Sequence, residues 1–268
     1  MNTICSIVCN THERADDNRP LPGVNMMKKI LVTGASSGIG RATAIECSRL
    51  GAALVLTGRN EKALQETKEQ LADLGNGHSI FVADLMNEDA CEDLVSRLPL
   101  LDGFVSNAGI GKMLPLQFYS LEVLDEVFRI NCFSPMLLLK LLVKRKRLKN
   151  NSSVVFTASI SGYNNVAPAN GIYGTSKSAL SAYMKYAALE LAGKGIRCNA
   201  VHPGRINTPL ISNRMLTEED VAKDVEQYPL KRYGEPSEVA HAIIYLLSDA
   251  ASWVTGTNLV IDGGRSLK

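Results

Sequence analysis

Short apolar runs alternate with longer amphipathic stretches from residue 29 almost to the end of the chain. The runs are nearly continuous in Val, Ile and Leu, a pattern typical of strands that are buried on both faces of a parallel sheet. They predict seven strands, at residues 30–33, 53–57, 79–83, 103–106, 153–158, 197–202 and 258–261.

The stretches between these strands carry apolar residues at helical spacing, as at 39–50, 61–74 and 121–148. A last helix is expected from Pro236, because proline suits a first helical turn. Its apolar stripe consists of Val239, Ala240, Ile243, Ile244 and Leu247. Alternating strands and helices predict an α/β fold of the Rossmann type, a doubly wound, parallel, seven-stranded sheet with helices on both faces.

Residues 1–26 show neither a helical nor a strand period. We expect them to form an N-terminal extension outside the fold, either disordered or appended. No Pro/Gly/Ser-rich linker divides the remainder, and with 46% hydrophobic residues the chain can bury a full core. Residues 27–268 are therefore predicted to form a single domain.

The charge balance gives little attraction to nucleic acid or to an anionic membrane, because the net charge is only +2. A basic run at 144–147 falls at the end of a predicted helix, where cations complement the helix dipole, so a solvated helix end is favoured over a nucleic-acid patch. The apolar segments 4–9 and 136–143 are far shorter than the roughly 20 residues that span a bilayer. We expect neither a nucleic-acid partner nor a membrane association.

The six cysteines are scattered and include no Cys-x-x-Cys pair, which favours a reduced, cytoplasmic setting. Cys5, Cys9 and His12 offer three potential metal ligands, but a structural zinc site takes four and the sequence nearby offers no other. No metal site is predicted.

A glycine-rich turn, Thr33-Gly-Ala-Ser-Ser-Gly-Ile-Gly40, follows the first predicted strand and opens a helix. Its glycines allow a tight turn and a close approach of the backbone to a pyrophosphate, while the helix N-terminus offers free N–H groups. The candidate cofactor-binding residues of this turn are Gly34, Ser36, Ser37, Gly38, Ile39 and Gly40. The alternative is a purely structural strand-to-helix turn.

Arg59 stands at the end of the second predicted strand, where no carboxylate is available to bind a ribose 2′-hydroxyl. A guanidinium there would pair with a 2′-phosphate, which favours NADP(H) over NAD(H). Glu61 lies close enough in sequence to weaken this preference, and a solvated surface arginine is the alternative. Asp84 and Leu85, at the end of the third strand, are expected beside the adenine.

Tyr173 and Lys177 are four residues apart in a predicted helix, so an ammonium lies beside a phenol on one face. Lowering the phenol pKa by two units needs about 3 kcal/mol. A charge pair at about 4 Å and an effective dielectric near 20 supplies on the order of 4 kcal/mol. Tyr173 can therefore act as an acid near neutral pH, and Ser159 lies upstream as a further candidate.

Over residues 29–264 the chain resembles the short-chain dehydrogenase/reductase family, most closely its 3-oxoacyl-(acyl-carrier-protein) reductases. The resemblance rests on an ordered set of motifs: the glycine turn, Asn107-Ala-Gly109, Asn131, Tyr-x-x-x-Lys, Pro203-Gly204-Arg-Ile206-Asn-Thr208, Thr255-Gly256 and Ile261-Asp-Gly-Gly264. It implies hydride transfer between a nicotinamide and a small-molecule carbonyl or alcohol.

The resemblance also implies roles for individual residues. Tyr173 would donate the proton to the carbonyl oxygen, Lys177 would lower the tyrosine pKa and bind the nicotinamide ribose, and Ser159 would polarise the carbonyl. Asn131 would help to hold a proton-relaying water, or would only kink its helix. Cofactor contacts are implied for Asn107, Ala108, Gly109, Tyr173, Lys177, Pro203, Gly204, Ile206 and Thr208.

Two departures from the family pattern concern the site. Ser106 replaces a more common asparagine, and the stretch from Ser159 to Tyr173 is one residue longer than usual, which leaves Ser161 as an alternative to Ser159. Residues 209–233 would form a mobile substrate loop. His202 is interpreted as structural, because the sequence offers no clear catalytic partner for it.

Other functions stay open at this point. An NADP(H)-binding regulatory or sensor protein without turnover and an NAD-dependent sugar or steroid dehydrogenase are the alternatives. An enoyl reductase is disfavoured, because those relatives separate the tyrosine and lysine more widely. The resemblance implies a homotetramer or homodimer, formed through apolar faces of the helices near 121–148 and 173–192.

Overall fold

The computed structural model describes residues 28–73, 75, 77–209 and 217–268. The predicted extension at 1–26, with Cys5, Cys9 and His12, lies outside the described residues, as does 210–216 of the expected substrate loop.

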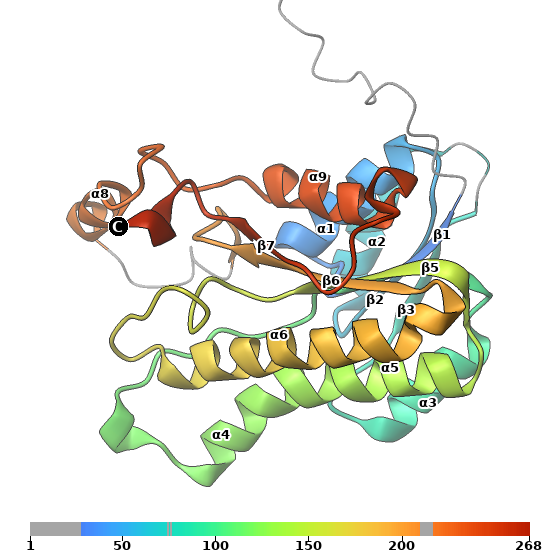
Figure 1. Ribbon diagram of the computed structural model, residues 1–268, viewed down its shortest axis with the longest axis horizontal. Coiled ribbons are helices and arrows are strands. Elements are labelled where there is room, and N and C mark those ends of the chain that lie inside the picture. The colour runs from blue at the N-terminus through green and yellow to red at the C-terminus, as the bar shows by residue number, and fades with distance from the viewer. Residues whose placement is uncertain (1–27, 74, 76, 210–216) are drawn as a thin grey trace, which may run out of the picture.

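Seven parallel strands form one sheet in the order β3-β2-β1-β4-β5-β6-β7 (Figure 1). The strands are β1 (Lys29–Thr33), β2 (Ala53–Gly58), β3 (Ser79–Val82), β4 (Leu101–Ser106), β5 (Leu148–Thr157), β6 (Arg197–Pro203) and β7 (Asn258–Ile261). The strand order reverses between β1 and β4, which is the switch point where doubly wound folds bind their ligands. The predicted Rossmann-type fold is confirmed.

Helices cover both faces of the sheet (Figure 1). One face carries α1 (Gly38–Arg49), α2 (Glu61–Glu69) and α9 (Pro236–Leu247), and the other carries α3 (Glu88–Arg97), α4 (Leu121–Phe128), α5 (Ser134–Lys144) and α6 (Gly171–Leu191). The short helix α8 (Glu218–Val225) lies near the C-terminus, away from both layers (Figure 1). Within the described residues, no helix is both long and apolar enough to cross a membrane.

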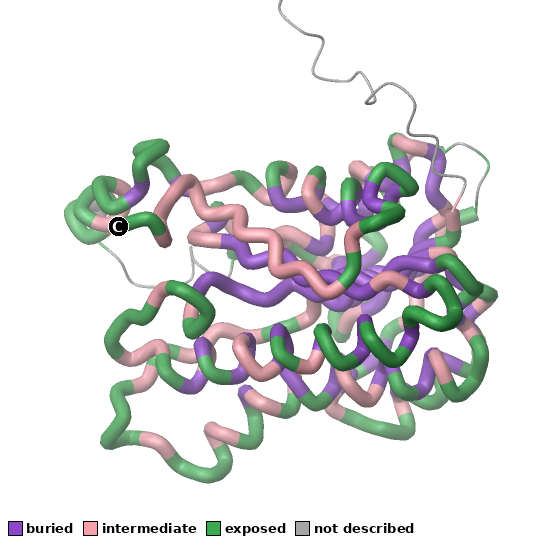
Figure 2. The backbone as a smooth tube through the Cα atoms, viewed as in Figure 1, coloured by how far each residue is buried: buried purple, intermediate pink, exposed green. Residues whose placement is uncertain are grey.

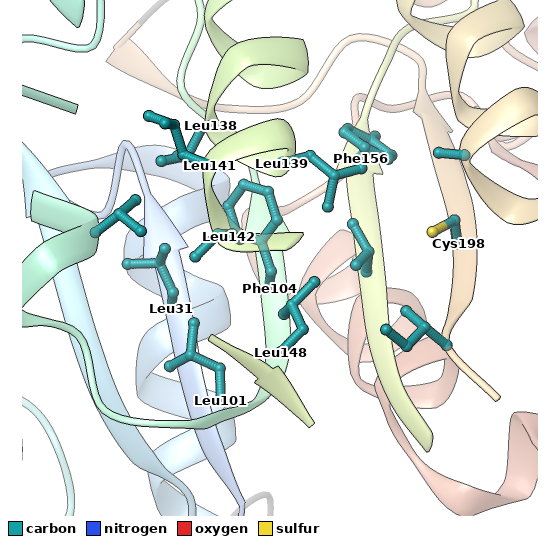
Figure 3. Close-up of a cluster of buried hydrophobic side chains, with 14 of the residues drawn as sticks. Leu31, Leu101, Phe104, Leu138, Leu139, Leu141, Leu142, Leu148, Phe156 and Cys198 are labelled. Carbon is teal, nitrogen blue, oxygen red and sulfur yellow. The ribbon is translucent and has the colours of Figure 1, made fainter. Parts of the chain in front are cut away.

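Each face of the sheet buries its own apolar layer; the central strands are largely buried, and the edge strands β3 and β7 are half-buried (Figure 2). Phe104 and Phe156 anchor the layer toward α5, where Leu138 and Leu142 pack on them (Figure 3). On the other face, the predicted stripe of α9 packs on α1 and on β5 and β6, in a cluster that also includes Ile30 and Leu54. The apolar strands therefore contribute side chains to a core on each face of the sheet, as is typical of parallel sheets.

The predicted helix at 61–74 is too long, because α2 ends at Glu69. The chain beyond it is held by groups outside the helix: Ser48 Oγ accepts from the N–H of Ala72 at 2.9 Å, and His78 Nε2 lies 3.1 Å from the Ala72 carbonyl oxygen. Leu71 stays buried without being helical. A buried leucine fits the core whether it is helical or not, so the apolar spacing alone predicts a helix end that is too late.

The predicted helix at 121–148 is wrong as a single α-helix. A π-helical turn, Arg129–Phe133, separates α4 from α5. Pro135 has no N–H to bond the carbonyl oxygen of Asn131, so the regular ladder is interrupted here. Lys146 then adopts a left-handed conformation with φ of 53°, and the chain turns into β5 at residue 148.

Leu148, predicted to be helical, pairs with Leu101 at the start of β5. This strand is longer than predicted and ends at Thr157, and β3 ends one residue early, at Val82. The basic run at 144–147 lies at the end of α5, as expected. Two of its side chains contact α3: Arg145 pairs with Glu92 at 3.3 Å and Arg147 donates to the Ser96 carbonyl oxygen.

Candidate active site

A cavity of about 500 Å³ lies at the carboxyl edge of the sheet, because the loops that follow the six strands β1 to β6 all meet there. Most of the candidate residues line its wall: Gly34, Ser36, Ser37, Gly38, Ile39, Arg59, Leu85, Asn107, Ala108, Gly109, Ser159, Tyr173, Lys177, Pro203, Gly204, Ile206 and Thr208. Three others, Gly40, Asp84 and Asn131, lie outside the wall.

The glycine turn brings its backbone to the cavity. Gly34 and Gly38 have φ of +63° and +54°, a conformation that side chains disfavour. A Cβ on Gly40 would clash with the carbonyl oxygen of Gly34, so Gly40 allows α1 to begin directly against the turn. Ser37, the N-cap of α1, makes no side-chain capping bond. The first N–H groups of α1 therefore face a cavity that an anion can enter.

Thr33 and Asn107 join the glycine turn to the loop after β4. Thr33 Oγ1 accepts from the N–H groups of Asn107 and Ala108, at 2.9 and 3.1 Å. The Asn107 amide donates in return to the carbonyl oxygens of Thr33 and Gly34, at 3.2 and 3.3 Å. Sequence reasoning missed this role of Thr33, although its place at the strand end could have indicated it.

Arg59 is exposed in the cavity wall directly after β2. Its neighbour Asn60 caps α2, accepting from the Ala63 N–H at 3.0 Å. Glu61 lines a different depression, beside His78 and Phe81, and does not reach the wall that holds Arg59. On the third strand's loop, Ala83 and Leu85 line the cavity, whereas the Asp84 carboxylate accepts from the Met86 N–H at 3.0 Å.

Tyr173 and Lys177 lie one turn apart on α6, and both line the cavity. Lys177 is 4% exposed, and its Nζ donates to the Thr157 carbonyl oxygen at 2.8 Å. Burial lowers the pKa of Lys177 to about 8, partly opposed by the nearby Cys132 thiol. A lysine of this pKa is mostly protonated at neutral pH and loses its proton when the pH rises above about 8.

Ser159 and Ser161 both follow β5 and both line the cavity. Ser159 Oγ accepts from the Ser161 N–H at 3.1 Å. Ser161 Oγ accepts instead from the side-chain amide of Asn170, at 2.9 Å, just before α6. Ser161 is thus tied to the α6 N-terminus, and Ser159 lies two residues beyond the strand end.

His202, at the end of β6, connects several parts of the site. Its Nδ1 donates to the carbonyl oxygen of Ser159 at 2.7 Å, since a carbonyl can only accept. Its Nε2 lies 3.1 Å from Ser181 Oγ and 3.0 Å from Asn258 Oδ1, and its ring packs against Tyr163 with centroids 4.2 Å apart. Burial lowers the pKa of His202, which keeps the ring neutral. The interpretation as a structural histidine fits these contacts.

Asn131 sits in the π-helical turn and is fully buried. Its side chain binds Ile110 twice, accepting from the N–H and donating to the carbonyl oxygen, each at 2.9 Å. The same amide donates to Ser176 Oγ at 3.1 Å. A Cβ on Gly109 would lie 2.8 Å from Asn131 Oδ1 and 3.1 Å from Lys177 Nζ. Gly109 therefore lies between these two side chains, where a larger residue would crowd them. Asn131 therefore fixes the loop beside the lysine.

The sequence reasoning did not single out several polar residues of the wall, among them Arg205, Asp224, Tyr228 and Arg265, although Asp224 and Tyr228 lie within the substrate loop expected at 209–233. Arg205 pairs with Asp224 at 3.3 Å, and Tyr233 Oη donates to the same carboxylate at 2.9 Å. The Arg205 N–H donates to Tyr228 Oη at 3.1 Å. Arg205 lies within the Pro203-Gly204-Arg-Ile206 motif, which could have indicated its place in the wall. Nothing in the sequence predicts that Arg265 lies here. Among the described residues, no group of His, Cys, Asp or Glu is arranged to hold a metal ion.

Comparison with known proteins identifies the family. Residues 34–266 match the family model described as enoyl-(acyl carrier protein) reductase. Levodione reductase of Leifsonia aquatica is 36% identical over 250 residues, covering 88% of this chain and 93% of that protein. The 3-oxoacyl-(acyl-carrier-protein) reductase FabG of Rickettsia felis is 34% identical over 238 residues, covering 88% and 96%. A crystal structure of levodione reductase matches with a TM-score of 0.82 at 33% identity, covering 90% of this chain and 98% of that one.

The chain therefore belongs to the short-chain dehydrogenase/reductase family. As a member of this family it is an oxidoreductase.

Proposed function

We propose that this protein is an NADP(H)-dependent oxidoreductase that transfers a hydride between a nicotinamide and a carbonyl or secondary alcohol carbon. One observation carries the proposal: Tyr173 and Lys177 enter, one helical turn apart, the same cavity that holds Ser159 and the glycine turn. Relatives named as reductases of levodione and of 3-oxoacyl thioesters support the reaction type.

The wall of the cavity fits a dinucleotide. The Gly34–Gly38 turn and the first N–H groups of α1 would hold the pyrophosphate. Leu85 would lie beside the adenine, and Pro203, Gly204 and Ile206 beside the nicotinamide. When bound, the cofactor supplies or accepts the hydride, and the protein residues supply orientation and the proton.

Tyr173 acts as the general acid in reduction and as the general base in oxidation. The Lys177 ammonium favours the phenolate and so lowers the work of proton release, while Ser159 donates a hydrogen bond to the substrate oxygen. Asn131 serves the proton path by holding the Ile110 loop beside Lys177, and its expected relay water is part of this proposal.

Purified protein would be assayed for NADPH and NADH consumption against ketones, diketones, 3-oxoacyl thioesters, sugars and steroids. An enoyl thioester would be included because of the description of the matching family model. We expect carbonyl reduction that Tyr173→Phe abolishes. Cofactor binding with no turnover on any carbonyl would contradict the proposal and favour the sensor alternative, and turnover unchanged in Tyr173→Phe would remove the assigned acid.

The preference for NADP(H) rests on Arg59, because Glu61 does not share its cavity wall. Loss of one guanidinium–phosphate contact is worth about 1.5–3 kcal/mol. Arg59→Gln should therefore weaken NADPH binding by about 10- to 100-fold and leave NADH binding unchanged. Lys62→Gln makes the same charge change outside the cavity wall and serves as the control. Equal losses for both cofactors in Arg59→Gln would contradict the preference.

We further propose a cytoplasmic homodimer or homotetramer. The four cysteines of the described region, Cys47, Cys91, Cys132 and Cys198, are buried and free, which supports a reducing compartment. Large apolar side chains are exposed on α4 and α6, which supports self-association through this layer.

A further inference from the structure

Two arginines of the cavity wall, Arg59 and Arg265, have guanidinium groups that make no ion pair or hydrogen bond with any residue the structure describes. The other cations of the wall are engaged: Lys177 donates to the Thr157 carbonyl oxygen, and Arg205 pairs with Asp224. Arg59 is explained by the proposed 2′-phosphate. Arg265 is left without a role.

Arg265 lies at the opposite end of the cavity from Arg59. Arg59 follows β2 and Arg265 follows β7, five strand positions apart in the sheet order, or roughly 24 Å at about 4.8 Å per strand. The segment before Arg265 packs on the loop after β6: a Cβ on Gly204 would lie 3.0 Å from Asp262 Cα and 3.4 Å from the Tyr228 ring. Arg265 therefore borders the nicotinamide end of the cavity, where the substrate would meet the cofactor, and lies far from the pyrophosphate.

Two carboxylates of this region, those of Asp262 and Asp224, are already engaged by other groups. Asp262 accepts from the N–H groups of Gly264 and Ser266, at 2.9 and 2.8 Å, and so closes the turn that carries Arg265. Asp224 binds Arg205 and Tyr233. Residues 210–216, outside the described region, include no Asp or Glu in their sequence.

We infer that the substrate carries an oxyanion, a carboxylate or a phosphate, in addition to the reacting carbonyl or alcohol, and that Arg265 binds it. The inference rests on the proposed oxidoreductase function. A guanidinium presents a planar set of N–H donors that matches two oxygens of either group. A neutral substrate would cover this cation without giving it a partner, so it should be bound less well.

The test uses pairs of carbonyl compounds that differ only in the anion: 4-oxopentanoate with its methyl ester, and dihydroxyacetone phosphate with dihydroxyacetone. For the wild type we expect kcat/KM to be at least tenfold higher for the anionic member of one pair, and the pair that responds tells carboxylate from phosphate. Arg265→Gln should abolish this preference, mainly through KM, because it lowers kcat/KM far more for the anionic member than for the neutral one. Arg265→Lys should retain part of it.

Lys268→Gln is the matched control, because it removes one positive charge from the same terminal segment outside the cavity wall. The inference is overturned if the wild type reduces both members of each pair equally well, or if Arg265→Gln lowers both members by the same factor. It is also overturned if Arg265→Gln weakens NADPH binding as much as it weakens the substrate, because Arg265 would then belong to the cofactor site.

A second readout separates this inference from the proposed function. Calorimetry would measure binding of propionate and of inorganic phosphate to the NADP⁺-loaded protein and its Arg265→Gln variant. If no carbonyl is turned over, the proposed function fails, while anion binding that depends on Arg265 still supports the anion site. Anion binding that is absent, or equal in the two proteins, overturns the site.

Discussion

At the scale of single residues, Lys177 is the group whose environment most changes its chemistry. Its ammonium is enclosed by the protein and donates to the Thr157 carbonyl oxygen. Burial disfavours the charged form, which lowers the pKa from 10.5 to about 8. The protein therefore keeps a destabilised ammonium at the position where the proposed mechanism needs a positive charge.

This pKa predicts a pH-dependent contribution of Lys177 to stability, which comparison with Lys177→Met isolates. Between pH 8 and 10.5 the unfolded chain keeps this proton and the folded chain releases it, so the Lys177 contribution to stability rises with pH in this window. Buried Cys47 and Cys198, whose pKa values are raised to about 12, act in the opposite direction, and their contribution cancels when the wild type is compared with a Lys177 variant. Relative to Lys177→Met, the wild type should gain up to about 3 kcal/mol of unfolding free energy across the window. Urea unfolding at several pH values measures it, and parallel pH curves for the two proteins would contradict it.

His202 provides a second prediction at this scale, because its Nδ1–H is the anchor of the Ser159 carbonyl oxygen. His202→Phe keeps a ring against Tyr163 but removes the anchor, so kcat should fall on the order of tenfold with little change in cofactor affinity. Ser181→Ala, which leaves the Nδ1 bond intact, is the control and should have a smaller effect. An unaltered kcat in His202→Phe would show that Ser159 does not depend on this anchor.

The depressed His202 pKa also has a sign that can be checked. As pH falls below 6.5 the unfolded chain takes up a proton that the folded chain resists, so the wild type loses stability. His202→Phe has no such group. Its unfolding free energy should therefore decline less than that of the wild type when the pH is lowered from 7 toward 5.

At the scale of elements, the glycine turn and α1 act as one unit, and Gly40 makes the junction possible. In Gly40→Ala the new methyl group would meet the Gly34 carbonyl oxygen and the Asn107 side chain. Overpacking of this kind costs about 1–3 kcal/mol. We expect a Tm lowered by several degrees, at about 2–4 °C per kcal/mol for a chain of this size, and NADPH affinity lowered at least tenfold.

Gly193→Ala is the matched control for that substitution, because no heavy atom lies within 4 Å of its Cβ position and its φ is not positive. It should leave cofactor binding unchanged and stability equal or slightly higher. Thermal unfolding with and without NADPH compares the two variants. Equal behaviour of Gly40→Ala and Gly193→Ala would mean that the turn is less constrained than its contacts indicate.

The elements also mark where sequence reasoning succeeds and where it stops. Strands such as β1 and β2 follow from local composition, because buried parallel strands are apolar throughout. The break in the 121–148 helix does not, since Asn131 is held by Ile110 and Ser176, which are distant in sequence. Pro135 is a local sign of a helix break, but the apolar spacing on both sides of it predicts one continuous helix.

At the scale of the whole molecule, the topology brings the loops of the six strands β1 to β6 to one edge, so the motifs proposed to bind the cofactor could be predicted to meet. The substrate end of the cavity is different. Asp224 reaches it from α8, within the expected loop at 209–233, whereas Arg265 reaches it from the C-terminal segment, which no motif in the sequence assigned to the site. The topology thus predicts where the cofactor motifs lie, whereas the residues at the substrate end are known only from the tertiary structure.

The outer layer of α4 and α6 makes a prediction about assembly. The two helices pack side by side, and Tyr186 and Leu189 on α6 are 67% and 79% exposed, with Leu121 of α4 at 78%. Large apolar side chains gathered on one layer favour burial against a partner, and a second copy offers the same surface for a symmetric contact. A stable contact would cover about 800 Å² on each copy.

We therefore expect the wild type to elute as a dimer or tetramer in size-exclusion chromatography with light scattering. The double variant Tyr186→Glu with Leu189→Glu should shift toward the 29.0 kDa monomer, because each carboxylate would be buried without a partner in the contact. Leu100→Glu, an exposed apolar position in the loop before β4, is the control and should not change the mass. A wild type that stays monomeric at micromolar concentration would contradict the assembly, and an unshifted double variant would place the contact on another face.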